Sequence, residues 1–133
     1  MTHRSRLAQI ILDCHTNDLD SATTFWSAAL GRRTRSLADP QDGRYRALGT
    51  RPYELNILLQ RVGHPSRVHL DIESDDVDAE IARLESLGTK RVSQNRTWWI
   101  MEAPTGHAFC VVPPKLPDLL EYGNARYREG HRR

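Results

Sequence analysis

Apolar and polar positions along the chain alternate in two recurring ways, which predict strands and helices in a repeated order. Residues 7–14 and 68–72 are short apolar runs rich in β-branched side chains, which are typical of strands. Each run leads through a polar turn into apolar residues spaced three to four apart, the period of a helix with one buried face. These stripes are Leu19, Ala22, Trp26 and Ala29 in the first copy, and Val77, Ile81, Leu84 and Leu87 in the second. We therefore expect a strand and a helix, twice, with both helices packed on a sheet.

Both predicted helices carry residues that fix their ends. The polar turn before each helix contains aspartates, whose side chains can cap the first backbone N–H groups. Gly31 and Gly88 follow the last apolar residues, where glycine adopts a left-handed cap without steric cost. Both helices should therefore end at a defined position.

The two strand–helix segments are copies of one unit. Aligned without a gap through most of their length, they match at paired positions: Leu12 with Leu70, Asp13 with Asp71, Asp18 with Asp76, Leu19 with Val77, Asp20 with Asp78, and Leu30-Gly31 with Leu87-Gly88 after one gap. Such self-similarity indicates a repeated supersecondary unit.

Three shorter strand-like runs follow each helix, so each copy is expected to be βαβββ. They cover residues 32–37, 44–50 and 54–62 in the first copy and 90–94, 98–102 and 108–112 in the second, with turns at Asp42-Gly43 and Thr105-Gly106. We expect a first module over 1–63, a second over 64–114 and a charged C-terminal tail over 115–133, which together form one compact domain.

Composition excludes several classes of protein. The chain is 38% hydrophobic and 27% charged, as in ordinary globular proteins, and its net charge of +2 gives no reason to expect a nucleic-acid partner. No apolar stretch approaches the length of a membrane span, and the first residues lack a signal-peptide core, so we expect a cytoplasmic protein with no membrane partner. Cys14 and Cys110 form neither a CxxC pair nor a dense framework, so buried free thiols are expected.

Tandem βαβββ units with these helix ends resemble the vicinal-oxygen-chelate superfamily of glyoxalase, bleomycin-resistance and dioxygenase proteins, over residues 7–113. The segments that resemble its glyoxalase-like branch are Leu12-Asp13-Cys14, Phe25 to Gly31, Arg67-Val68-His69-Leu70-Asp71 and Gly106 to Val111. The resemblance implies an α+β fold in which tandem βαβββ modules form a cupped mixed β-sheet with the helices on its convex side. It also implies a small-molecule ligand on the concave side and a homodimer.

Strand alternation predicts which side chains face this cup. We expect the apolar side of the two first strands to pack under the helices; it consists of Ile10, Leu12, Cys14, Val68, Leu70 and Ile72. The residues that alternate with them then face the cup, and they are Gln9, Ile11, Asp13, Arg67, His69 and Asp71. By the same alternation Leu55, Ile57, Leu59, Phe109 and Val111 are core. The residues that then face the cup are Glu54, Asn56, Leu58, Gln60, Ala108, Cys110 and Val112.

The metal site that the resemblance implies is incomplete. Its four ligand positions correspond to Ile11, Gln60, His69 and Cys110. Ile11 cannot coordinate a metal, Gln60 is a weak donor and Cys110 favours softer ions, so we expect no cofactor. A shifted divalent-metal site that draws on His69, Asp13, Asp71, Gln60 and Cys110 is the alternative.

Asp13, His69 and Asp71 are the candidate catalytic residues, because inward carboxylates beside an imidazole suit acid–base chemistry. The candidate ligand-binding residues are Ile11, Gln60, Trp98, Trp99, Ala108 and Cys110, and since Trp98 and Trp99 alternate, one of them is core and the other can stack on a ligand. A structural alternative remains: His69 bonded to Asp71, and the aspartates bonded to Arg44, Arg46 or Arg67.

These residues leave three functions open. The first is a metal-independent lyase or isomerase of glyoxalase-like type, acting next to a carbonyl. The second is a non-catalytic protein that sequesters a drug, as bleomycin-resistance proteins do, for which a basic or aromatic ligand would suit the two aspartates. The third is a metal-dependent lyase or dioxygenase. The sequence does not decide between catalysis and binding.

Overall fold

The two apolar, β-branched runs form the longest strands of the computed structural model, β1 (Thr2–Cys14) and β5 (Arg67–Ser74). The structure describes residues 2–35, 43–49, 55–115 and 119–127. Glu54, predicted to face the cup, lies outside these described residues. By its contacts the chain divides into one unit of residues 9–69 and another of residues 1–8 with 70–133. Both divisions fall inside strands, so β1 and β5 contribute residues to each unit.

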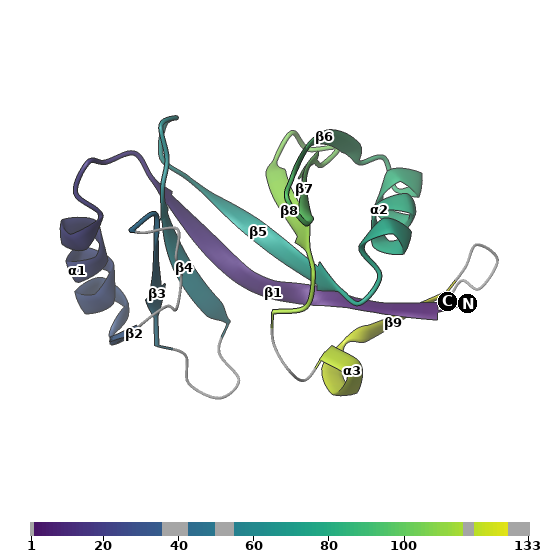
Figure 1. Ribbon diagram of the computed structural model, residues 1–133, viewed down its shortest axis with the longest axis horizontal. Helices are drawn as coiled ribbons and strands as arrows, with labels where there is room; N and C mark the ends of the chain where they lie inside the picture. The colour runs from purple at the N-terminus through teal and green to yellow at the C-terminus, as the bar shows by residue number, and fades with distance from the viewer. Residues whose placement is uncertain (1, 36–42, 50–54, 116–118, 128–133) are drawn as a thin grey trace. The chain divides into compact units, whose positions relative to one another are not determined.

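The 9–69 unit has one helix over a small mixed sheet. Its elements after β1 are α1 (Leu19–Leu30), β2 (Thr34–Arg35), β3 (Tyr45–Leu48) and β4 (Asn56–Arg61). β4 pairs parallel with β1, β3 pairs antiparallel with β4, and β2 pairs antiparallel with β3 (Figure 1). The core contains Cys14, Leu19, Leu48 and Leu59, with Leu12, Ala22, Trp26 and Ile57 packed against it. The first helical stripe thus packs on this core as predicted as far as Trp26, with Ala22 and Trp26 partly buried, whereas Ala29 is exposed because the core does not reach the last turn.

The second unit repeats this arrangement. After β5 come α2 (Val77–Ser86), β6 (Lys90–Asn95), β7 (Trp98–Glu102) and β8 (Ala108–Val112). β8 pairs parallel with β5, and β7 and β6 follow as antiparallel neighbours. The core contains Ile81, Leu84, Met101, Phe109 and Val111, with Ile72, Val77, Trp99 and Ala103 against it. Leu87, predicted for the buried stripe, is 61% exposed because it caps the helix, which ends at Ser86.

The helix ends match their predicted chemistry. The Asp18 and Asp76 side chains accept hydrogen bonds from the backbone N–H groups of Ser21 and Ala79. Gly31 has a φ of 69° and Gly88 a φ of 103°, in the left-handed region where only glycine lacks a penalty.

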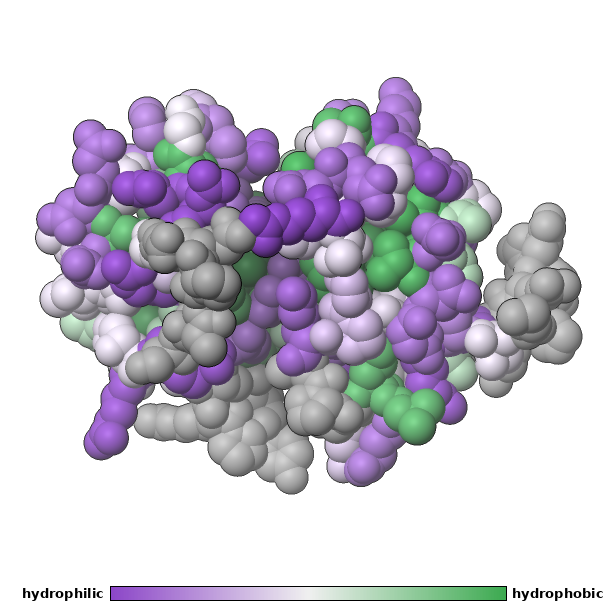
Figure 2. All heavy atoms as spheres, viewed as in Figure 1, coloured by the Kyte–Doolittle hydropathy of each residue, from purple (hydrophilic) through white to green (hydrophobic). Residues whose placement is uncertain are grey.

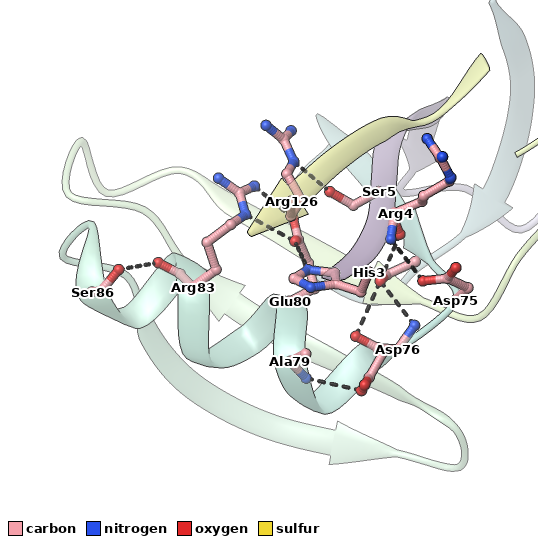
Figure 3. Close-up of polar contacts among 11 residues, drawn as sticks. His3, Arg4, Ser5, Asp75, Asp76, Ala79, Glu80, Arg83, Ser86 and Arg126 are labelled. Atoms are coloured by element: carbon pink, nitrogen blue, oxygen red, sulfur yellow. Dashed lines mark hydrogen bonds and ion pairs between the residues drawn. The ribbon is translucent and has the colours of Figure 1, made fainter. Parts of the chain in front are cut away.

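The segment after residue 114, expected to be a tail, contains structure in its described part. It forms α3 (Leu119–Tyr122) and β9 (Asn124–Tyr127). β9 pairs antiparallel with residues 2–5 of β1. The Arg126 Nε also donates to Ser5 Oγ at 2.9 Å, and both side chains are drawn in Figure 3. This pairing explains why β1 begins at Thr2, five residues before the predicted strand.

A buried charged cluster joins α2 to the start of β1. Glu80 is fully buried and accepts hydrogen bonds from Arg83 Nε and Nη2 at 2.9 and 2.7 Å (Figure 3). His3 Nε2 lies 2.8 Å from the same carboxylate. Burial by itself raises the pKa of Glu80, but the bonds from Arg83 and His3 outweigh it and hold that pKa below its ordinary value.

The predicted fold class is confirmed: each repeat is βαβββ, with a parallel pair between its first and last strands. The predicted burial of three residues is wrong, since Leu55, Val68 and Leu70 are 40%, 56% and 43% exposed. Val68 and Leu70 lie on β5 ahead of Ile72, the first β5 residue packed against the α2 core. Both cysteines are buried free thiols, as expected.

The described surface is mixed. On the side that Figure 2 shows, hydrophilic residues predominate and hydrophobic ones are visible in small groups. Among the described residues, no helix has the length and apolar character needed to cross a bilayer.

Candidate functional site

The face of the 9–69 sheet opposite α1 carries ordered rows of side chains. In the strand registers Asp13 lies opposite Gln60, and Gln60 opposite Tyr45, which makes a polar row across β1, β4 and β3. The next row is apolar and consists of Ile11, Leu58 and Ala47, and the row beyond it contains Gln9 and Asn56. Since paired residues share a face, strand alternation places the rows together.

Asp13 and His69 form the centre of this face. Asp13 Oδ2 lies 2.8 Å from His69 Nδ1, and the two side chains are only 2% and 12% exposed. Arg67 Nε reaches the same oxygen at 3.5 Å. The other oxygen, Asp13 Oδ1, is buried and has no hydrogen-bond partner among the residues that the structure describes. A buried acceptor left in this state is uncommon, and it suits a ligand that brings a donor.

Amide side chains extend the polar rows. Gln60 Nε2 donates to Tyr45 Oη at 3.2 Å, and Asn56 Nδ2 donates to Gln9 Oε1 at 2.8 Å. Tyr45 was not among the residues proposed from sequence. Alternation along its short strand, with Leu48 in the core, would have indicated that Tyr45 faces the same side as Gln60.

The predicted structural alternative, in which arginines bond the aspartates, agrees with the contact of Arg67. Arg67 approaches Asp13, whereas Arg46 binds Asp20 at 2.9 Å on the α1 side of the sheet. Cys14, next to Asp13 in sequence, points into the α1 core. Burial raises the pKa of the Cys14 thiol, and the charge of Asp13 raises it further, so this cysteine stays protonated and is a poor nucleophile.

In the second unit, Asp71 lies opposite Cys110, and Cys110 opposite Ile100. Asp71 is 6% exposed and Cys110 9%. Alternation along β7 places Trp98 on this same face, while Trp99 packs against the α2 core and beneath Arg91, whose Cζ is 5.2 Å from the ring centroid. Ala108 and Val112 share the face of Cys110. Trp98 is therefore the tryptophan that lies on the face predicted to hold a ligand, and Trp99 is the core tryptophan.

One group of donors could hold a metal ion. His69 and Asp71 are two residues apart on the same face of β5, which continues unbroken through this point, and Cys110 pairs with Asp71. One ligand atom from each of the three lies within 4.8 Å of the others. The resemblance implied ligands at four positions, of which His69 and Cys110 belong to this group. The other two do not contribute, because Ile11 has no donor atom and the Gln60 amide donates to Tyr45.

The chemistry of this donor set fits a zinc-like ion. Nitrogen, oxygen and sulfur donors together suit zinc better than calcium or magnesium, and three protein ligands leave a position for substrate or water. The carboxylate of Asp13 on His69 Nδ1 would orient the ring, as carboxylates bonded to the other ring nitrogen of zinc-binding histidines commonly do. A bound ion would supply Lewis-acid polarisation of a carbonyl.

Residues 9–112 match the family model described as a glyoxalase-like domain. Methylmalonyl-CoA epimerase from Mycobacterium tuberculosis has 18% sequence identity and a TM-score of 0.61, with 83% of this chain and 88% of that one covered. The Mn(II)-bound glyoxalase from Novosphingobium aromaticivorans has 17% identity and a TM-score of 0.57, with 87% and 43% covered. An extradiol ring-cleaving dioxygenase from B. fuscum has 19% identity and a TM-score of 0.54, with 84% and 33% covered. No curated protein matches at a significant level. At these identities the structural likeness shows the fold alone.

Proposed function

Because the chain belongs to the family of glyoxalase-like domains, we propose that it binds a small carbonyl compound and moves a proton on the carbon beside the carbonyl. The observation that carries this proposal is the 2.8 Å contact between His69 Nδ1 and the buried Asp13 carboxylate. A buried carboxylate on Nδ1 fixes the ring orientation and stabilises the imidazolium, so that Nε2 can accept a proton from carbon.

The residues around the pair suit such a step. When a base removes a proton beside a carbonyl, negative charge develops on the carbonyl oxygen and requires a donor. Gln60 lies opposite Asp13 in the β1–β4 register and carries an amide N–H group. The apolar row of Ile11, Leu58 and Ala47 gives a surface for the hydrocarbon part of the ligand.

A second candidate function is metal-assisted lyase chemistry, and the cluster of His69, Asp71 and Cys110 favours it. In that case the ion would polarise the carbonyl, and Asp13 would orient His69 as a ligand. The two candidates use the same histidine and differ in their requirement for a metal.

The test is solvent exchange. The protein in D₂O is incubated with a set of enolisable 2-oxo acids, 2-oxo esters and acyl thioesters, and loss of the C–H signal is followed by NMR. We expect catalysed exchange for at least one class, and a fall of about a hundredfold or more in His69→Gln, the usual worth of a general base.

The matched control is His107→Gln, because His107 is exposed in the turn before β8 and bonds Thr105. This variant should exchange as the wild type does. Exchange in His69→Gln at the wild-type rate would refute the proposal. Binding of a compound with no exchange would indicate the sequestering function instead.

A further inference from the structure

Arg67 is a cation held at the edge of the Asp13–His69 pair. Its Nε is 3.5 Å from Asp13 Oδ2, and its side chain is 51% exposed whereas that of Asp13 is 2% exposed. Among the residues that the structure describes, the terminal nitrogens of Arg67 have no hydrogen-bond partner. Asp13 Oδ2 also lies 2.8 Å from His69 Nδ1, so one carboxylate serves both side chains and the exposed end of the Arg67 guanidinium stays available to a ligand.

The guanidinium of Arg67 is the exposed member of its pair with Asp13, whose carboxylate is buried. A ligand that approaches this edge therefore meets the cation first, which favours an anionic ligand over the basic one that the sequence suggested. Arg35 shares this face of the 9–69 unit, since it lies opposite Ala47, but its guanidinium donates to Asn56 Oδ1.

We propose that Arg67 binds a carboxylate of the substrate, so that the compound acted on is a small carboxylic acid with its reactive C–H next to a carbonyl. This inference rests on the proposed function. The planar fork of a guanidinium matches a carboxylate with two parallel hydrogen bonds.

The spacing along β5 agrees with this assignment. Arg67 and His69 are two residues apart on one face, so their Cα atoms are about 6.7 Å apart. A carboxylate held by Arg67 leaves the adjoining carbonyl and its C–H within reach of the imidazole. Arg67 is therefore the residue that selects the substrate class.

Pyruvate and methyl pyruvate test the inference, since they share the exchanging methyl group and differ in charge. Exchange of each in D₂O is measured for the wild type, Arg67→Gln and Arg35→Gln. Arg35 makes the matched control, because it has the same charge and face but lies on β2, four strands from β5 and thus about 19 Å away.

In the wild type we expect kcat/KM to be higher for pyruvate, and Arg67→Gln should raise KM for pyruvate about tenfold or more while changing kcat far less. The effect on methyl pyruvate should be at least tenfold smaller. Arg35→Gln should leave the preference intact. Equal use of both compounds by the wild type, or equal losses in the two variants, would overturn the inference while leaving the proposed function standing.

Oxamate, which resembles pyruvate but has no C–H bond to exchange, separates binding from catalysis. Calorimetry should show that oxamate binds the wild type and that its binding weakens about tenfold in Arg67→Gln and not in Arg35→Gln. Such binding together with no exchange of any substrate would support the anion site and refute the proposed catalysis. Absence of oxamate binding to the wild type would overturn the anion site itself.

Discussion

Two buried carboxylates of this protein have opposite surroundings. Glu80 is bonded through both oxygens to Arg83 and through one to His3, so its charge is satisfied within the fold. Asp13 is bonded through Oδ2 alone, and its buried Oδ1 has no partner among the described residues. We therefore regard Glu80 as structural and Asp13 as the carboxylate available to a ligand.

The role of Glu80 predicts a stability effect. In Arg83→Gln the buried carboxylate loses both hydrogen bonds from the guanidinium, and the free energy of unfolding measured with urea should fall by about 2 kcal/mol. Arg91→Gln is the matched control, because Arg91 makes a two-bonded pair with the exposed Glu85. It should change stability far less, and equal losses would contradict the structural role of Glu80.

The pH dependence of that effect has a definite sign. The pKa of Glu80 is lowered in the folded state, so its stabilising contribution is complete above the unfolded-state pKa and is lost as pH falls through the folded-state value. The difference between wild type and Arg83→Gln should therefore be full at pH 7 and shrink below about pH 4. A difference that grows in acid would show that another group controls it.

For individual residues, the sequence predicted which face of the sheet a side chain lies on better than it predicted which residue that side chain bonds. Alternation placed Asp13 and His69 on one face, which the 2.8 Å contact between them agrees with. The structural alternative named Asp71 as a carboxylate for His69 and did not name Asp13, which lies 2.8 Å from His69 Nδ1 because β1 lies beside β5 in this unit. A partner on another strand depends on register, which local patterns do not contain.

The elements were predictable wherever apolar period and end signals agreed. Both helices begin after a capping aspartate, and β7 and β8 cover the residues predicted for them. The start of β1 and the whole of β9 were not foreseen, because their polar residues are satisfied by pairing with each other. Local hydrophobicity carries no signal for such strands.

The cap of α2 can be tested directly. Asp76→Ala removes the acceptor for the Ala79 N–H and should lower the free energy of unfolding by about 1 kcal/mol. Asp76→Asn keeps a capping oxygen and should cost only a few tenths of a kcal/mol. Chemical denaturation measures both variants, and an equal loss in the two would mean that the charge near the helix start matters more than the cap.

For the whole molecule, the internal repeat was the most informative feature of the sequence. It predicted two βαβββ copies, and the family match over residues 9–112 agrees with the resemblance drawn from it. Function was harder to predict from the sequence than the fold. One position at which the resemblance implies a metal ligand holds Ile11, which has no donor atom, while residues that have donor atoms lie at neighbouring positions. A fold shared by epimerase, glyoxalase and dioxygenase proteins does not select among reactions.

The most direct test of the account is deuterium exchange into a substrate by protein stripped of metal with a chelator, compared with Asp13→Asn. Proton transfer by His69 oriented by Asp13 predicts that the stripped wild type retains its exchange rate, while Asp13→Asn loses about a hundredfold or more. Exchange that disappears on chelation and returns with zinc would contradict this metal-independent role of His69 and Asp13. Exchange by Asp13→Asn at the wild-type rate would contradict it as well.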